Sequence, residues 1–433
     1  MSFHPLREVP ARAGWGPGDV LVLFGELFGR GYANGIVEEA RRAGMAVVGA
    51  TVGRRDPGGP LRALTPEELA AAEANLGGRI VNVPMEAGFD LEPAGDGASP
   101  VDQLKGARAD AWREVALDWD LVARSREAGA LRFEKNLVSF AAEVERLVPP
   151  GANLLFVHTM AGGFPRARVY MPLMTRIFRG TGERYLPSDA FWASDLGRLW
   201  DASFEEVTAR TFGRLVAATA RLRQPGRRVR YVAYGYHGCE VATGGALRWQ
   251  TYVPYMQGWA KMLLERLSAE AWAEGVRCTV FNAPEIWTNS SALFLGVEVS
   301  LYPLLRALRE HGGQGTAAEE VWDACRALLR QGATPEGLLA RADEYLGAPS
   351  LERFRRIDGW PQHSAPEQVE AMLAASEACM AMSADPRNPA CEALSRPVFQ
   401  AVGRIMFHAS WEPRAPVEWV GHDVVAKVVT GGV

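Results

Sequence analysis

The chain has 433 residues, 48% of them hydrophobic, and a formal net charge of −4, enough apolar material for a large core. The lack of a basic excess argues against nucleic acid as a partner. No stretch reaches the ~18 apolar residues of a membrane span, and the N-terminus has no apolar signal region, so we expect a cytoplasmic protein. Five cysteines without paired spacing are typical of reduced thiols, and seven histidines show no metal-binding spacing, so we expect no metal site.

The first recognisable unit is an extended apolar run at residues 19–24, a glycine-rich turn, a helical stretch at 32–44 and a second apolar run at 45–52. The turn reads Gly25-Glu26-Leu27-Phe28-Gly29-Arg30-Gly31. Glycines in a strand–turn–helix unit let the backbone approach a pyrophosphate, whose charge the helix N-terminus stabilises. We therefore predict that Gly25, Gly29 and Gly31 bind a dinucleotide.

The second strand is followed by Gly53-Arg54-Arg55-Asp56. An arginine at this place can pair with a ribose 2′-phosphate, whereas an acid binds a free 2′-hydroxyl. Arg54 and Arg55 therefore favour NADPH, and Asp56 leaves NADH open. The alternative is that the two arginines are simply solvated in a turn.

Apolar strands and helices continue to alternate along the chain. We predict helices at 66–76, 107–127, 131–147, 204–223 and 254–274, and strands at 79–83, 153–158, 230–236 and 277–282. This alternation predicts a Rossmann-type α/β fold with a doubly wound parallel sheet. Ligands of such sheets bind at the carboxyl ends of the strands, where Glu86, residues 158–163, 234–239 and 284–288 would share one rim with the glycine turn.

Tyr252 and Lys261 are separated by eight residues, with Pro254 between them. Proline favours the first position of a helix, so Tyr252 should lie just before the helix and Lys261 about two turns inside it. A phenol and an ammonium could then converge on one pocket. A helix running back through Tyr252 would instead place the two side chains on opposite faces.

These motifs together resemble the short-chain dehydrogenase/reductase superfamily over about residues 18–300. Ordinary members carry Tyr-x3-Lys, but here Gln257 occupies that tyrosine position. The Tyr-x8-Lys spacing, the upstream Tyr234 and the Ser-rich segment 289–294 are similar to the trans-2-enoyl-CoA and enoyl-acyl-carrier-protein reductase branch.

The resemblance implies an NAD(P)H-dependent reductase of α,β-unsaturated thioesters carried on CoA or acyl carrier protein, in fatty acid or polyketide metabolism. Tyr252 would stabilise the enolate, Lys261 would hold the nicotinamide ribose, and Tyr234 would be a second donor or a residue packed on its strand. The cofactor would further contact Glu86, Ala161, Gly162, Pro284, Ile286 and Thr288.

We expect a cofactor-binding catalytic core at residues 1–288 with a helical insertion near 90–151. By analogy with the enoyl reductases, residues 289–350 would form a helical lid and 351–433 a C-terminal extension on the core. Two other functions stay open: a carbonyl or hydroxyl oxidoreductase on the same scaffold, and a non-catalytic nucleotide-binding homologue. The oligomeric state stays open as well.

Overall fold

The computed structural model describes residues 3–29, 31–56, 59–94, 97–180, 188–251, 256–288, 295–312, 316–357, 362–363 and 365–431. Within them lies a seven-stranded sheet of β1 (Val20–Phe24), β2 (Ala46–Thr51), β5 (Arg79–Pro84), β6 (Leu154–His158), β7 (Val229–Gly235), β10 (Cys278–Asn282) and β11 (Val417–Trp419). The spatial order is β11-β10-β7-β6-β1-β2-β5, and all neighbouring strands are parallel. The predicted Rossmann-type α/β fold is therefore confirmed.

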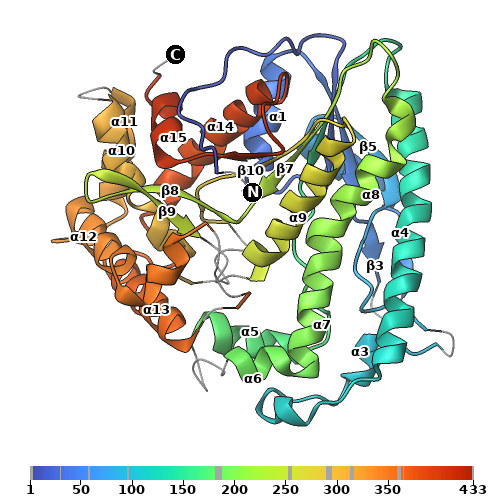
Figure 1. Ribbon diagram of the computed structural model, residues 1–433, viewed down its shortest axis with the longest axis horizontal. Helices are drawn as coiled ribbons and strands as arrows, with labels where there is room; N and C mark the ends of the chain where they lie inside the picture. Colours follow the sequence, from blue (N-terminus) through green and yellow to red (C-terminus); the bar gives the residue numbers. More distant parts are fainter. Residues whose placement is uncertain are drawn as a thin grey trace.

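Helices cover both faces of this sheet (Figure 1). On one face pack α1 (Ala33–Arg42), α10 (Leu304–Gly312), α14 (Glu392–Ala409) and α15 (His422–Val429), and on the other α4 (Trp119–Leu147), α8 (Thr211–Ala218) and α9 (Met256–Ala273). Alternate residues of β1 point into the two layers: Leu21 and Leu23 into the first, Val20 and Val22 into the second. A strand buried on both faces must be apolar throughout, which is why it was visible in the sequence.

The helical region before β6 differs from the prediction. Instead of two helices at 107–127 and 131–147, a short 3₁₀ segment η1 (Ala109–Glu114) precedes the single 29-residue helix α4. Gly129 lies inside α4 and does not break it. A Cβ there would come within 2.8 Å of the Phe89 side chain, so this glycine permits close packing.

A β-hairpin between β7 and α9 was not predicted. It consists of β8 (Gly238–Thr243) and β9 (Ala246–Thr251), paired antiparallel. Its turn residues Gly244 and Gly245 have φ of 57° and 76°, as required at both central positions of a type I′ turn. The hairpin occupies most of the interval between Tyr234 and Tyr252.

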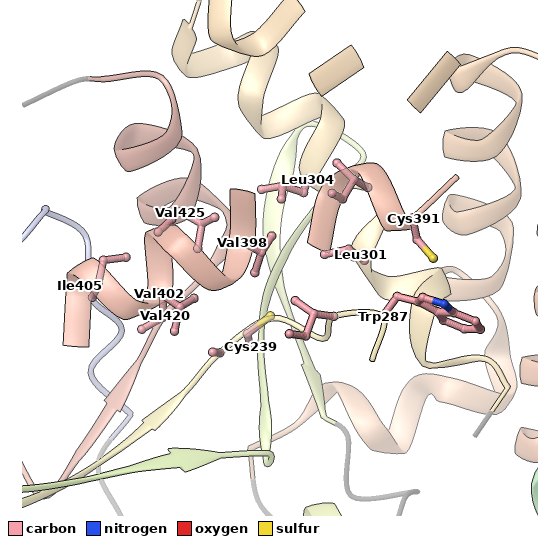
Figure 2. Packing of buried hydrophobic residues seen from close by; sticks show 14 of the residues in the cluster. Cys239, Trp287, Leu301, Leu304, Cys391, Val398, Val402, Ile405, Val420 and Val425 are labelled. Carbon is pink, nitrogen blue, oxygen red and sulfur yellow. The ribbon is translucent and has the colours of Figure 1, made fainter. Parts of the chain in front are cut away.

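The C-terminal residues return to the central sheet. β11 pairs with β10, and α14 packs against α1 so closely that a Cβ on Gly403 would lie 2.2 Å from the Gly35 backbone. Figure 2 shows the apolar core on this side, where Val398, Val402 and Ile405 of α14 meet Val425 of α15 and Leu304 of α10. Part of the segment expected as an extension is thus integral to the sheet layer.

None of the described helices is long and apolar enough to cross a membrane. The remaining elements are α2 (Pro66–Leu76), α3 (Pro100–Gln103), α5 (Tyr170–Phe178), α6 (Ser188–Ala193), α7 (Asp195–Phe204), η2 (Glu205–Arg210), η3 (Ala220–Leu222), η5 (Val297–Leu301), α11 (Thr316–Ala327), α12 (Pro335–Leu346), η6 (Pro349–Arg355), α13 (Pro366–Met380) and the short pair β3 (Arg54–Arg55) and β4 (Leu61–Arg62).

Candidate active site

A cavity of about 250 Å³ lies at the carboxyl ends of the parallel strands. The strand order reverses between β1 and β6, and in such sheets the crevice outside this point is where ligands bind. Segments that follow four strands line the cavity: Gly25, Glu26 and Phe28 after β1, Val52 after β2, Glu86, Ala87, Gly88 and Asp90 after β5, and Thr159, Met160, Ala161, Gly163, Phe164 and Arg166 after β6.

The glycine turn combines one closely packed glycine with two glycines whose backbone is open. Gly25 has φ 141°, and a Cβ there would lie 2.1 Å from Thr159 Oγ1, so the turn passes tightly against the segment after β6. A Cβ on Gly29 or Gly31, in contrast, would have no atom within 4 Å, which leaves their backbone open. Gly25 lines the cavity. Gly29 and Gly31 follow Gly25 in the chain and precede α1, which begins at Ala33.

The loop after β6 is held by a π-helical turn. Gly162 has φ 103°, and its carbonyl accepts a hydrogen bond of 2.9 Å from Thr208 in η2. Val207 of the same turn and Ser203 just before it line the cavity. Of the two residues predicted here, Ala161 lines the cavity, and the cofactor contacts of Ala161 and Gly162 stay predictions. The support by η2 was not predicted, because a π-turn has no period that distinguishes it from the flanking helix.

The two arginines predicted to meet a 2′-phosphate are ion-paired. Arg54 lies 2.9 Å from Glu26, and Arg55 lies 3.1 Å from Glu86 and 3.0 Å from Glu92. Burial alone would raise the pKa of Glu86, but hydrogen bonds from Arg166 and Arg55 lower it overall. The positive charges of Arg54 and Arg55 are therefore already balanced by neighbouring carboxylates.

Lys261 is buried on α9, with 3% of its surface exposed. Burial disfavours its charged form and lowers its pKa to about 7. Burial, with a further contribution from the Lys261 charge, also lowers the pKa of His158, whose Nε2 lies 2.8 Å from Thr211 Oγ1. Tyr252, Pro254 and Tyr255 lie outside the described residues, so the convergence of Tyr252 and Lys261 stays a prediction.

A buried polar network that the sequence did not reveal lies one turn beyond Lys261. His237 Nδ1 lies 2.9 Å from a carboxylate oxygen of Glu265, which also accepts a hydrogen bond of 2.7 Å from Asn282. The Asn282 side chain in turn accepts from the His237 backbone N–H at 2.9 Å. Thr251 at the end of β9 donates to the His237 carbonyl at 2.8 Å. The network therefore joins the ends of β7, β9 and β10 to α9.

The remaining predicted contacts lie on the α1 side of the sheet. The Tyr234 hydroxyl donates to the Tyr32 carbonyl at 2.9 Å, and the two rings stack with centroids 5.2 Å apart. The Pro284 carbonyl accepts from the Tyr32 hydroxyl, Ile286 is buried in the core, and Thr288 is partly exposed. Tyr234 is thus packed on its strand, as in the alternative to a role as second donor. Its catalytic role, and cofactor contacts by residues 284, 286 and 288, stay predictions.

Comparisons with known proteins agree with this geometry. A family model described as enoyl-acyl carrier protein reductase FabMG matches residues 2–429. The chain is similar to the solved apo structure of FabMG, described as a novel type of enoyl-acyl carrier protein reductase, with 47% identity, a TM-score of 0.93 and coverage of 99% of this chain and 98% of the other. It is also similar to an NADH-bound FabMG structure, with 39% identity, a TM-score of 0.77 and 99% coverage of both chains. No curated protein matches the chain.

Proposed function

We propose that this chain reduces enoyl thioesters of acyl carrier protein with NADH. The chain belongs to the FabMG family of enoyl-acyl carrier protein reductases and is an oxidoreductase acting on the CH–CH group. The observation that carries the proposal is the cavity at the switch point of the sheet, with its glycine turn. The family assignment favours this function over the carbonyl oxidoreductase and the non-catalytic homologue.

The residues around the cavity fit a dinucleotide. The open backbone at Gly29 and Gly31 precedes α1, and no described side chain caps the N-terminus of α1, so the positive end of its dipole suits a pyrophosphate. The carboxylates of Glu26, Glu86 and Asp90 line the cavity and pair with the arginines that a further phosphate would need. The preference for NADPH expected from Arg54 and Arg55 is not supported, and a FabMG structure holds NADH.

The chemistry that we propose assigns each group a distinct role. Bound NADH would supply a hydride to the β-carbon of the enoyl thioester, and the resulting enolate would take a proton from solvent at its α-carbon. The Tyr252 hydroxyl donates a hydrogen bond to the thioester oxygen as negative charge develops there, a contribution typically of ~3 to 4 kcal/mol for one oxyanion donor. Lys261 binds the nicotinamide ribose hydroxyls, and its low pKa lets it give or take a proton near neutral pH.

The sheet order supports placing the family within the short-chain dehydrogenase/reductase superfamily. Counted along the sheet from β5 to β10, the strands run 3-2-1-4-5-6 in chain order, which is the dinucleotide-binding arrangement. Lys261 lies on the helix that follows β7 and its hairpin, where the superfamily carries its lysine. We therefore propose that the family belongs to this superfamily.

The test is NADH oxidation with matched substrates. We expect turnover with crotonyl-acyl carrier protein, slower turnover with crotonyl-CoA, and none with an acetoacetyl thioester. NADPH would replace NADH poorly. Turnover of the β-keto thioester in preference to the enoyl one would overturn the proposal. Equal rates with CoA and acyl carrier protein would remove only the choice of carrier.

A further inference from the structure

Glu26 of the glycine turn reaches across to the end of the neighbouring strand β2. One carboxylate oxygen, Oε1, accepts hydrogen bonds from Thr51 Oγ1 at 2.7 Å, from the Val52 N–H at 3.1 Å and from Arg54 Nη1 at 2.9 Å. Glu26 lines the cavity, and 21% of its side chain is exposed. An acid contributed by the first turn is therefore anchored at the end of the second strand.

This place has a defined role in dinucleotide-binding sheets. There an acid normally carried by the second strand binds the ribose hydroxyls of NAD, and an arginine accommodates the extra phosphate of NADP. Here the residues after β2 are Val52, Gly53, Arg54 and Arg55, none of them an acid, and the acid that follows, Asp56, is ion-paired with Arg62 at 3.2 Å and does not line the cavity. We infer that Glu26 replaces the missing acid, binds the adenosine ribose hydroxyls and selects NADH over NADPH. This inference rests on the proposed function only in requiring a nicotinamide cofactor.

The distribution of hydrogen bonds on Glu26 supports the inference. All three bonds end on Oε1, and within the described parts of the chain Oε2 has no hydrogen-bond partner. A carboxylate oxygen that lines a cavity and has no partner is suited to accept from a hydroxyl, because an ionised carboxylate only accepts. A ribose 2′-phosphate offers no such donor and would bring like charge to the same place.

Arg54 explains how the same pair of residues excludes NADPH. Its guanidinium is 2.9 Å from Glu26 and also donates to the Gly53 carbonyl at 2.7 Å. With these partners it is not available to pair with a ribose 2′-phosphate, the role expected from the sequence. While Glu26 is charged, Arg54 is neutralised. Loss of the Glu26 charge frees Arg54 to pair with a phosphate, so one substitution should weaken NADH and strengthen NADPH.

The experiment measures cofactor binding without substrate, by fluorescence titration of the full chain with NADH and with NADPH. Glu26→Gln preserves size and removes charge. We expect the dissociation constant for NADH to rise about tenfold and that for NADPH to fall about tenfold. Adding Arg54→Ala to Glu26→Gln should abolish the gain for NADPH. Glu26→Asp, which retains the charge on a shorter side chain, should weaken NADH without strengthening NADPH.

A matched control is Glu73→Gln, because Glu73 also accepts from an arginine side chain, Arg79, and from a backbone N–H, that of Ile80, and does not line the cavity. It should leave the ratio of the two affinities unchanged. A wild-type preference for NADPH, or an unchanged ratio in Glu26→Gln with an unchanged unfolding temperature, would overturn the inference. Failure of the wild type to bind either cofactor would instead overturn the proposed function.

Discussion

One polar region lies at the cavity and a second lies one helical turn beyond Lys261, and the two differ in exposure. The first, which we call the rim, consists of Glu26, Arg54, Arg55, Glu86 and Arg166, with side chains 16% to 40% exposed. The second, the inner network, consists of His237, Glu265 and Asn282, with His237 and Glu265 side chains at most 5% exposed. Ion pairs near water exchange partners at little cost, whereas breaking a buried pair leaves an uncompensated group. The rim is thus suited to recognise a ligand and the inner network to fix a geometry.

The inner network fixes both ends of one segment. His237 accepts from Thr251 through its carbonyl and contacts Glu265 through its ring. Tyr252 directly follows Thr251, and Lys261 lies one helical turn before Glu265. A single residue therefore connects the backbone beside the proposed oxyanion donor with the helix that carries the buried lysine.

The largest expected effect is the loss of the Tyr252 hydroxyl. Tyr252→Phe should lower kcat for an enoyl thioester ~100-fold or more, because one oxyanion donor is removed, while NADH binding is retained. The measurement is steady-state NADH oxidation together with a binding titration. Tyr255→Phe is the control, since it also removes one hydroxyl three residues away. The opposite result, with Tyr255→Phe inactive and Tyr252→Phe active, would refute the assignment of Tyr252.

The next effect concerns the pH dependence of stability without cofactor. The folded pKa of Lys261 is about 7, below its ordinary value of 10.5, so between these pH values the unfolded state holds a proton that the folded state has lost. The free energy of unfolding should then rise with pH relative to that of Lys261→Met, by ~1.4 kcal/mol per pH unit from about pH 7 upward. Below pH 7 both states are charged, and the difference should be constant.

Denaturant unfolding at several pH values measures this dependence. Lys135→Met provides the control, because Lys135 is exposed on α4. Its difference from the wild type should not vary over the same range. A Lys261→Met difference that is equally flat would show that burial does not neutralise Lys261.

The inner network gives a smaller effect on turnover. His237→Ala should lower kcat about tenfold, ~1.4 kcal/mol, with little change in the dissociation constant for NADH, because the segment between Thr251 and Glu265 loses its common support. His237→Asn, whose amide can donate to Glu265 in place of Nδ1, should recover part of the loss. His408→Asn is the control, since His408 accepts a hydrogen bond from the Ala13 backbone N–H and does not line the cavity. A purely structural role would lower the unfolding temperature of His237→Ala without changing kcat of the folded fraction.

The sequence predicted the parts of this molecule whose cause is local. The central strands are apolar on both faces, and the glycine turn needs φ values that only glycine adopts readily, so both were visible. The hairpin at Gly244-Gly245 had a local signal that was missed. The continuity of α4 through Gly129 was not predicted, because the residue that packs against this glycine, Phe89, is distant in sequence. The contacts of Glu26 with Thr51 and of His237 with Glu265 arise only when strands are placed side by side. Residue spacing contains no information on such contacts.

The smallest expected effect is at the rim, and it tests directly the difference between the rim and the inner network. Arg55→Ala removes the ion pairs to Glu86 and Glu92, yet each carboxylate keeps another arginine: Arg166 lies 2.8 Å from Glu86, and Arg132 lies 2.6 Å from Glu92. Because these replacements are already in place, the dissociation constant for NADH should change less than about threefold, and the free energy of unfolding by less than about 1 kcal/mol. Titration and denaturant unfolding measure the two quantities. If Arg55→Ala were more harmful than His237→Ala, the rim and not the inner network would hold the site in place.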